Sequence, residues 1–208
     1  RWHFSSGEMK EMRNENNKTF VKILAKAVRV ITVPPLLIGA LLVALYVYPS
    51  GVFTSFSSLL FSLTFLSVIP SLSYLVWAVI PALRRKGRDS QRKLAFVFSI
   101  LGYLGGAVYA LTADISRGLT IILFTYFVSV VLLTLINKLT VFHASGHGCG
   151  VTGPLLLPAY FVNPFWIGPS LLGLLAVYVS SIVLKRHTLK ELVAGSSAAL
   201  LSFLFCLV

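Results

Sequence analysis

The chain has 208 residues, of which 57% are hydrophobic and only 12% are charged. A soluble domain usually carries about 25% charged residues, so this composition excludes an ordinary water-soluble globular protein. The net charge is +12, from 18 Lys and Arg residues against 6 Asp and Glu residues. Because the basic residues cluster between apolar runs, we expect anionic membrane lipids or a phosphate ligand as partners, and no nucleic acid.

The first 28 residues are polar and basic. Four basic residues recur at helical spacing among apolar ones: Lys18, Lys22, Lys26 and Arg29. This pattern is typical of an amphipathic helix that lies on the lipid headgroups, and the alternative is a plain basic flank before the first membrane span. We therefore expect a surface segment over residues 1–28 and a single transmembrane domain over residues 29–208.

Seven apolar stretches follow, and a membrane-spanning helix needs about 20 mostly apolar residues. The stretches are Arg29–Tyr48, Phe53–Leu83, Leu94–Ala113, Gly118–Ile136, Gly148–Val162, Phe165–Leu184 and Thr188–Val208. Their continuous apolar character excludes the alternating pattern of a membrane β-barrel. The sequence therefore predicts an all-α, polytopic membrane helical bundle. It has seven spans, or six if the short fifth stretch crosses only part of the bilayer.

The distribution of basic residues predicts the orientation. With seven spans, seventeen of the eighteen Lys and Arg residues fall on the side of the N-terminus, and only Arg117 falls on the other side. Loops rich in Lys and Arg stay in the cytoplasm. We expect the N-terminus, and every polar segment on its side, to be cytoplasmic.

Three polar segments converge on that basic side. Residues 85–93 open the third apolar stretch, residues 143–148 open the fifth, and residues 187–191 open the last. Polar groups beside membrane spans are costly, so segments that keep them are candidates for function. A single basic cluster or terminal histidine is usually only a topology signal or a helix cap. Three such segments on one side favour a functional site.

The residue types suit phosphate chemistry. His187 and Glu191 are four residues apart, so they share one face of a helix and can form a hydrogen bond. A carboxylate bonded to one imidazole nitrogen fixes the tautomer and leaves the other nitrogen as a nucleophile. Ser145, Gly146 and His147 stand at a predicted helix start, where free N–H groups attract an anion. Positive charge for phosphate oxygens is supplied by Arg85, Arg92 and Lys93.

These motifs resemble those of the type 2 phosphatidic acid phosphatase superfamily. Its signature is Lys-x6-Arg-Pro, then Pro-Ser-Gly-His, then Ser-Arg-x5-His-x3-Asp. The second motif corresponds to Ser145-Gly146-His147, and the third to His187-x3-Glu191. Arg85-x6-Arg92 or Lys86-x6-Lys93 fits the first motif without its proline. The similarity covers residues 85–195, about half of the chain, and is closest to the short prokaryotic members.

The resemblance implies a membrane hydrolase that removes phosphate from a lipid phosphate or an isoprenoid (pyro)phosphate. It also implies a phosphohistidine intermediate and no metal or other cofactor. His187 would be the nucleophile, Glu191 would orient it, and His147 would protonate the leaving oxygen. The phosphate would be bound by Ser145, Gly146, Arg85 or Lys86, and Arg92 or Lys93.

The sequence departs from the family pattern at three positions. Ser181 stands where the third motif has its arginine, Glu191 replaces an aspartate, and Ala144 replaces a proline. The missing arginine matters most, because losing one donor to the transition state costs roughly 10²–10³ in rate. In an active enzyme another cation must take its place, and we expect Arg186, Lys185 or His143.

Two other functions fit the same residues. One is a metal-dependent membrane hydrolase, because His143, His147, His187 and Glu191 form two i, i+4 pairs of possible ligands. The other is a non-catalytic relative that binds anionic lipid or scaffolds a partner, which the serine at position 181 favours. A transporter is disfavoured, because charge within the apolar stretches is scarce and no internal repeat is evident.

Overall fold

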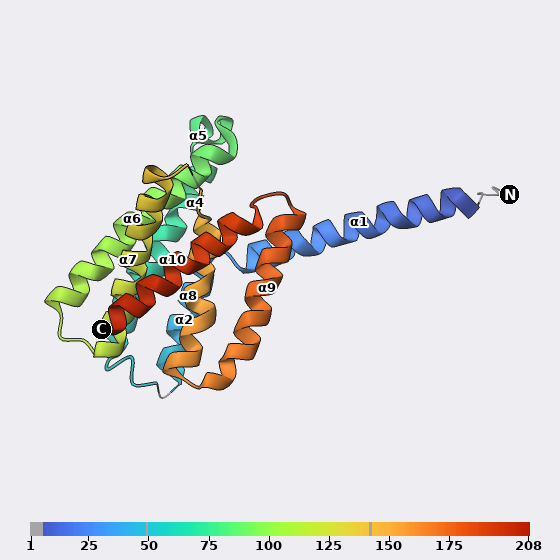
Figure 1. Ribbon diagram of the computed structural model, residues 1–208. Coiled ribbons are helices and arrows are strands. Elements are labelled where there is room, and N and C mark those ends of the chain that lie inside the picture. The colour runs from blue at the N-terminus through green and yellow to red at the C-terminus, as the bar shows by residue number, and fades with distance from the viewer. Residues whose placement is uncertain (1–5, 49, 142) are drawn as a thin grey trace.

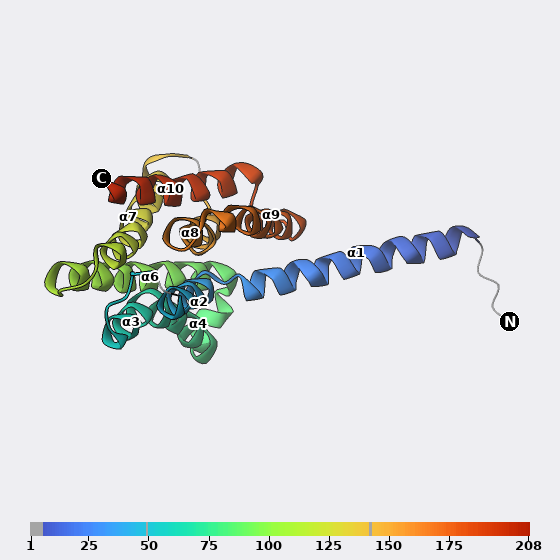
Figure 2. The ribbon, with the colours of Figure 1, turned by 90° about the horizontal axis from the view of Figure 1, so that it is seen from below.

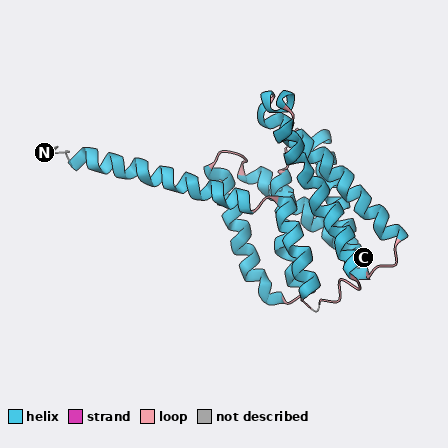
Figure 3. Cartoon of the chain, turned by 180° about the vertical axis from the view of Figure 1, so that it is seen from behind, coloured by secondary structure: helices cyan, strands magenta, loops and turns pink. Residues whose placement is uncertain are grey.

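The protein is a bundle of α-helices. A computed structural model describes residues 6–48, 50–141 and 143–208, and these residues form helices and loops without any strand (Figure 3). The predicted all-α membrane fold is confirmed. Five helical segments are long and apolar enough to cross a membrane: Phe56–Val79, Gly87–Thr112, Arg117–Leu139, Pro164–Val183 and Leu189–Leu207. A sixth span results if the bent pair of N-terminal helices is counted as one.

By length and composition the described helices give at most six spans, because the predicted fifth stretch is too short to cross a bilayer. It forms α8 (Gly146–Phe161), which has 16 residues. At 1.5 Å per residue α8 is about 24 Å long, less than the roughly 30 Å of a hydrocarbon core. The helix contains Pro154 and Pro158, yet it stays regular enough to pack along its neighbours.

The N-terminal helix projects away from the bundle. The helix predicted over residues 18–29 is present within α1 (Ser6–Ile31). The C-terminal end of α1 contacts the bundle, and the rest of the helix projects away from it (Figure 1). The chain then bends by 55° into α2 (Pro34–Val47). Val33 is extended because it precedes a proline, and this divides the predicted first span in two.

The next helices form a hairpin with a tight tip. α3 (Phe56–Leu63), the π-helical turn η1 (Thr64–Val68) and α4 (Ile69–Val79) form one apolar segment. The π-helical turn ends two residues before Pro70, and a proline inside a helix removes one helical hydrogen bond. The short α5 (Pro81–Arg85) and the left-handed Gly87 (φ 69°) then turn the chain into α6 (Gly87–Thr112).

The remaining helices alternate in direction. They are α7 (Arg117–Leu139), α8, the 3-10 turn η2 (Pro164–Trp166), α9 (Ile167–Val183) and α10 (Leu189–Leu207). The starts of α6, α8 and α10 therefore lie at the same end of the bundle as α5, as Figure 1 shows. We call this the site end. Arg117 lies at the opposite end, where its side chain reaches the carbonyl of Leu207 at 3.4 Å.

Apolar side chains fill the middle of the bundle and cover its outside. Figure 2 shows α8, α9 and α10 on one side, with α2, α3, α4 and α6 on the other. Fully buried leucine and isoleucine side chains join the two halves, among them Ile38, Leu42, Leu66, Leu119, Ile122 and Leu157. Many large apolar side chains face outward, for example Leu172 (70% exposed) and Phe205 (72% exposed). Such a surface fits lipid and does not fit water.

Candidate active site

The start of α10 positions the carboxylate of Glu191. Thr188 is the N-cap residue, and its hydroxyl accepts a hydrogen bond from the backbone N–H of Glu191 at 3.3 Å. The carboxylate reaches back to the N–H of Thr188, also at 3.3 Å, which completes a capping box. The same oxygen, Oε2, accepts a hydrogen bond from Nδ1 of His187 at 2.8 Å. The expected contact between His187 and Glu191 is therefore present.

Two helix ends hold His187 between them. α9 finishes with the N–H of Arg186 bonded to the carbonyl of Ser181 and that of Lys185 bonded to Ile182, at 2.9 Å each. This is a Schellman motif, and Lys185 takes the left-handed position (φ 51°) where glycine is usual. The turn therefore has a fixed shape and places His187 directly before the capped start of α10. The His187 side chain is 11% exposed.

The charge state of His187 suits a nucleophile. Burial lowers the pKa of His187, while the hydrogen bond and charge of Glu191 raise it, and the net shift is downward. The imidazole is therefore neutral at neutral pH. Because Nδ1 donates to the carboxylate, Nε2 carries the lone pair.

The start of α8 is fixed against α10. Ser145 is the N-cap of α8, with its hydroxyl accepting from the N–H of Gly148 at 3.1 Å. Its own N–H donates to the carbonyl of Glu191 at 2.8 Å. A side chain on Gly195 would collide with the backbone of Ser145, and one on Gly148 would come within 2.9 Å of the Leu192 carbonyl. Glycines thus let the two helix starts touch through their backbones.

An asparagine side chain holds the loop before α8. The side-chain amide of Asn137 accepts from the N–H of Ala144 at 2.7 Å and donates to the carbonyl of Ala144 at 3.3 Å. A proline at position 144 would have no N–H to donate to Asn137. The pairing therefore requires another residue there, and Ala144 stands where the phosphatase signature has proline. Asn137 was missed in the sequence, where nothing distinguishes it from an ordinary helix-terminal residue.

His147 lies in the first turn of α8, beside His187. Its Nε2 is buried and has no hydrogen-bond partner among the described residues. Burial lowers the pKa of His147 to about 3, with further lowering by the charges of Arg29 and His187. An unpaired buried nitrogen costs free energy, so the arrangement favours a bound polar group. The N–H groups of Gly146 and His147 belong to the first turn and have no intrahelical acceptor.

Ser181 is contacted by an arginine that comes from the other end of the sequence. The Nη1 atom of Arg29, near the end of α1, donates to the hydroxyl of Ser181 at 2.9 Å. Ser181 is fully buried, and Arg29 is partly buried. The expected substitutes were Arg186, Lys185 and His143, but the guanidinium that contacts the side chain of Ser181 is that of Arg29. Only the helical spacing of the basic residues in α1 hinted at it.

Three arginines, Arg29, Arg92 and Arg186, lie around the two histidines, and none of them forms an ion pair with a carboxylate of the described residues. Arg29 interacts electrostatically with Arg186, with Arg92 and with both histidines, and Arg92 also acts on His187. Within the described part of the chain, the pair of His187 and Glu191 is the one ion pair. The carboxylate of Glu191 acts on Arg92, but no carboxylate of the described residues pairs with Arg29 or Arg186. The arginine charges therefore repel one another, and an anion would relieve that repulsion.

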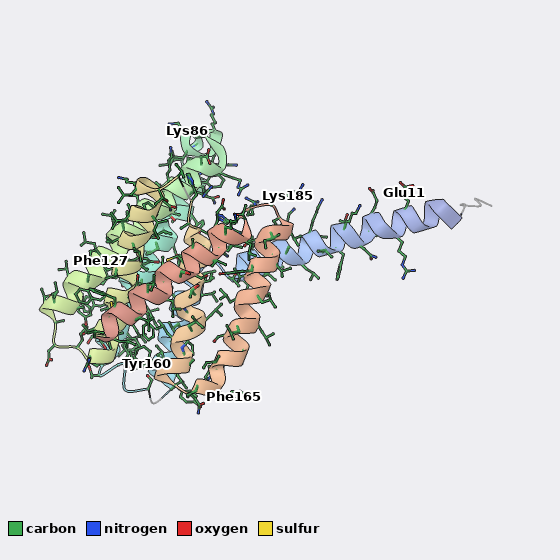
Figure 4. The ribbon with its side chains drawn as sticks, in the orientation of Figure 1. Glu11, Lys86, Phe127, Tyr160, Phe165 and Lys185 are labelled. Carbon is green, nitrogen blue, oxygen red and sulfur yellow. The ribbon has the colours of Figure 1, made fainter. Side chains whose placement is uncertain are left out.

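The first motif is brought to the site only in part. Arg92, in the first turns of α6, is the member that interacts with His187 and Glu191. Arg85 instead lines an outer depression of about 450 Å³ with Trp77, Pro81 and Arg84. Lys86 is exposed at the tip of the turn between α5 and α6 (Figure 4). Lys93 is exposed on α6, with no ion pair to the described residues.

The four residues considered as metal ligands do not form a metal-binding group in the described part of the chain. His143 is exposed in the loop before α8. Within residues 6–48, 50–141 and 143–208, no group of three or more His, Cys, Asp or Glu side chains is placed to hold a metal ion. The i, i+4 spacing of His143 and His147 does not put them on one helix face, because α8 begins only at Gly146. The geometry therefore does not support the metal-dependent alternative.

No family model, curated protein or solved structure matches the chain.

Proposed function

We propose that the protein is a membrane phosphatase that hydrolyses a lipid phosphate or an isoprenoid (pyro)phosphate through a phosphohistidine. The observation that carries the proposal is the hydrogen bond from His187 to Glu191, set beside His147 and three arginines that form no ion pair with the described residues. A nucleophile oriented by a carboxylate, an acid and a cluster of cations are the groups that phosphoryl transfer needs.

The reaction follows in two steps. Nε2 of His187 attacks phosphorus, the P–O bond to the lipid alcohol breaks, and His147 gives its proton to the leaving oxygen. Water then attacks the phosphohistidine, the P–N bond breaks, and His147 takes the proton of the water. Arg29, Arg92 and Arg186 would hold the charge of the phosphoryl oxygens through both steps. A lipid monophosphate gives inorganic phosphate and the lipid alcohol; with a diphosphate, the terminal phosphorus is attacked, the P–O–P bond breaks, and the lipid monophosphate leaves in place of the alcohol.

His147 can act as an acid only when it is protonated, and binding of the substrate favours the protonated form. Without a ligand, burial and the neighbouring cations keep His147 neutral. A phosphate dianion beside the imidazole favours its charged form, so the proton enters together with the substrate. Before the substrate binds, the arginines leave the site with an excess of positive charge. This arrangement favours anionic over neutral lipids as ligands.

The position of the site suits a substrate held in the bilayer. The three polar helix starts lie at one end of the bundle, and the apolar outer surfaces of α9 and α10 lead away from that end (Figure 1). A lipid tail would lie along the bundle while its phosphate enters among the arginines. The excess of basic residues at the site end favours a cytoplasmic position for this end.

The test is phosphate release by the purified protein in detergent, from phosphatidic acid, isoprenoid monophosphates and isoprenoid diphosphates. We expect turnover with at least one class, unaffected by chelator, and loss of about 10³-fold or more in His187→Gln. An acid-labile phosphorylated histidine should be trapped in wild type. His143→Gln is the matched control and should keep its rate.

Three outcomes would contradict the proposal. Activity that needs a divalent cation, or that His143→Gln abolishes, would restore the metal-dependent alternative. A wild-type protein that binds phosphatidic acid vesicles but releases no phosphate from any lipid would be a non-catalytic lipid-binding relative. Turnover that persists in His187→Gln would place the nucleophile elsewhere.

A further inference from the structure

The side chain of Ser181 is paired with an arginine from the N-terminal helix. Ser181 lies in the last turn of α9, six residues before His187, and its side chain is fully buried. The guanidinium of Arg29 donates to its hydroxyl at 2.9 Å, across 152 residues of sequence. Because serine is short, it leaves space at this position and offers an acceptor that can anchor an incoming side chain.

Arg29 is held in place without an ion pair. It is partly buried near the end of α1, where α1 packs against α9, and Ala25 one turn earlier is buried in the same contact. A buried guanidinium normally pairs with a carboxylate, because burial of an unpaired charge is costly. No carboxylate of the described residues pairs with Arg29. One of its donors serves Ser181, and the others remain for a further acceptor.

The surroundings of Arg29 indicate what that acceptor is. Its charge acts on His147 and on His187, the proposed acid and nucleophile, and it repels Arg92 and Arg186. A group that satisfies all of them carries at least two negative charges and several acceptor oxygens. A phosphoryl group meets this requirement, and a guanidinium binds it by two parallel hydrogen bonds.

We propose that Arg29 is a phosphate-binding residue that supplies, from α1, the guanidinium otherwise expected at position 181. The inference rests on the proposed function, and it assigns a role to both halves of the pair. Ser181 anchors the guanidinium, and Arg29 contacts the phosphoryl oxygens. The site is then incomplete without α1, the helix that also contains most of the segment expected on the membrane surface.

The experiment moves the arginine back to α9. Four proteins are compared: wild type, Arg29→Ala, the double variant Arg29→Ala/Ser181→Arg, and Lys26→Ala. Lys26 is an exposed basic residue on the same helix and serves as the matched control. Each protein is measured by calorimetric titration with inorganic phosphate and by turnover on the best lipid phosphate. Thermal unfolding in detergent establishes that each variant is folded.

We expect Arg29→Ala to weaken phosphate binding at least 10-fold and to lower turnover roughly 10²–10³-fold. The double variant should recover at least a tenth of the wild-type turnover, and Lys26→Ala should stay within about 2-fold of wild type. Recovery by an arginine on another helix is a result that a merely structural role of Arg29 would not produce.

Other results would overturn the inference. Arg29→Ala with wild-type binding and turnover would remove Arg29 from the site. A folded double variant no better than Arg29→Ala would show that the two positions are not equivalent. If wild type binds phosphate through Arg29 but hydrolyses no lipid, the proposed function fails while the role of Arg29 as an anion ligand stands. If wild type does not bind phosphate, both fail.

Discussion

One carboxylate oxygen of Glu191 accepts two hydrogen bonds. Oε2 closes the capping box with the N–H of Thr188 and also accepts the N–H of His187. The spacing of His187 and Glu191 was enough to predict the second contact. The first was missed, although Thr188-x-x-Glu191 is an ordinary capping-box pattern. The cap matters to the site, because a carboxylate fixed at both sides cannot rotate away from the imidazole.

Protonation of His147 should be coupled to phosphate binding. The pKa of His147 is about 3 in the free protein, so the residue is neutral at neutral pH, and a bound dianion raises that pKa. Phosphate binding should therefore take up a proton, and the affinity should fall as the pH rises. Calorimetric titrations at about pH 8, where phosphate is already a dianion, measure this uptake in two buffers of different ionisation enthalpy.

The matched variant for this measurement is His147→Gln, which keeps a polar side chain but cannot take up a proton. Its phosphate affinity should be weaker and its binding enthalpy nearly the same in both buffers. Equal proton uptake by His147→Gln and wild type would assign the proton to another group, such as His187.

At the scale of helices, the contact between α8 and α10 joins the two histidine-bearing segments. Its closeness depends on Gly148 and Gly195, whose missing side chains admit the backbone of the opposite helix. The sequence shows both glycines, but it does not show that they face each other. Pairing of helices distant in sequence is decided by packing, which no single stretch reveals. The helix in α1 and most helix bounds could be predicted, because apolar length and proline positions act locally.

Gly195→Ala should therefore damage both stability and activity. The new methyl group would collide with the backbone of Ser145, so α10 must move away from α8. Overpacking of this kind costs about 1–3 kcal/mol, and the shift would also misalign His187 and Glu191 against His147. We expect a lower unfolding temperature and at least a 10-fold loss of turnover.

Gly168→Ala is the control for that change, since nothing lies within 4 Å of its added methyl group in α9. It should leave turnover unchanged and raise stability by up to about 1 kcal/mol. Wild-type turnover in Gly195→Ala would show that the close approach of α8 and α10 is not needed for the site.

At the scale of the whole molecule, the sequence predicted which segments share one end but not which cations meet there. Alternating spans bring the starts of α6, α8 and α10 together, and this follows from the apolar pattern alone. Among the basic residues, Arg92 and Arg186 lie close to the site, whereas Lys86 extends from the tip of the α5–α6 turn (Figure 4). Arg29 could not be found, because its position depends on the 55° bend between α1 and α2 and on the docking of α1 against α9.

The orientation of the bundle is open to direct measurement. Lys86 at the site end and Phe165 near the opposite end are both exposed (Figure 4), and each can be replaced by cysteine in a Cys149→Ala/Cys206→Ala background. The excess of basic residues at the site end predicts that a membrane-impermeant maleimide labels Phe165→Cys in intact cells. Lys86→Cys should react only after the cells are opened, since the same excess predicts that its end of the bundle faces the cytoplasm. The opposite labelling pattern would mean that the arginines are kept at this end for phosphate and not for topology. The substrate phosphate would then be cleaved on the outer side of the membrane.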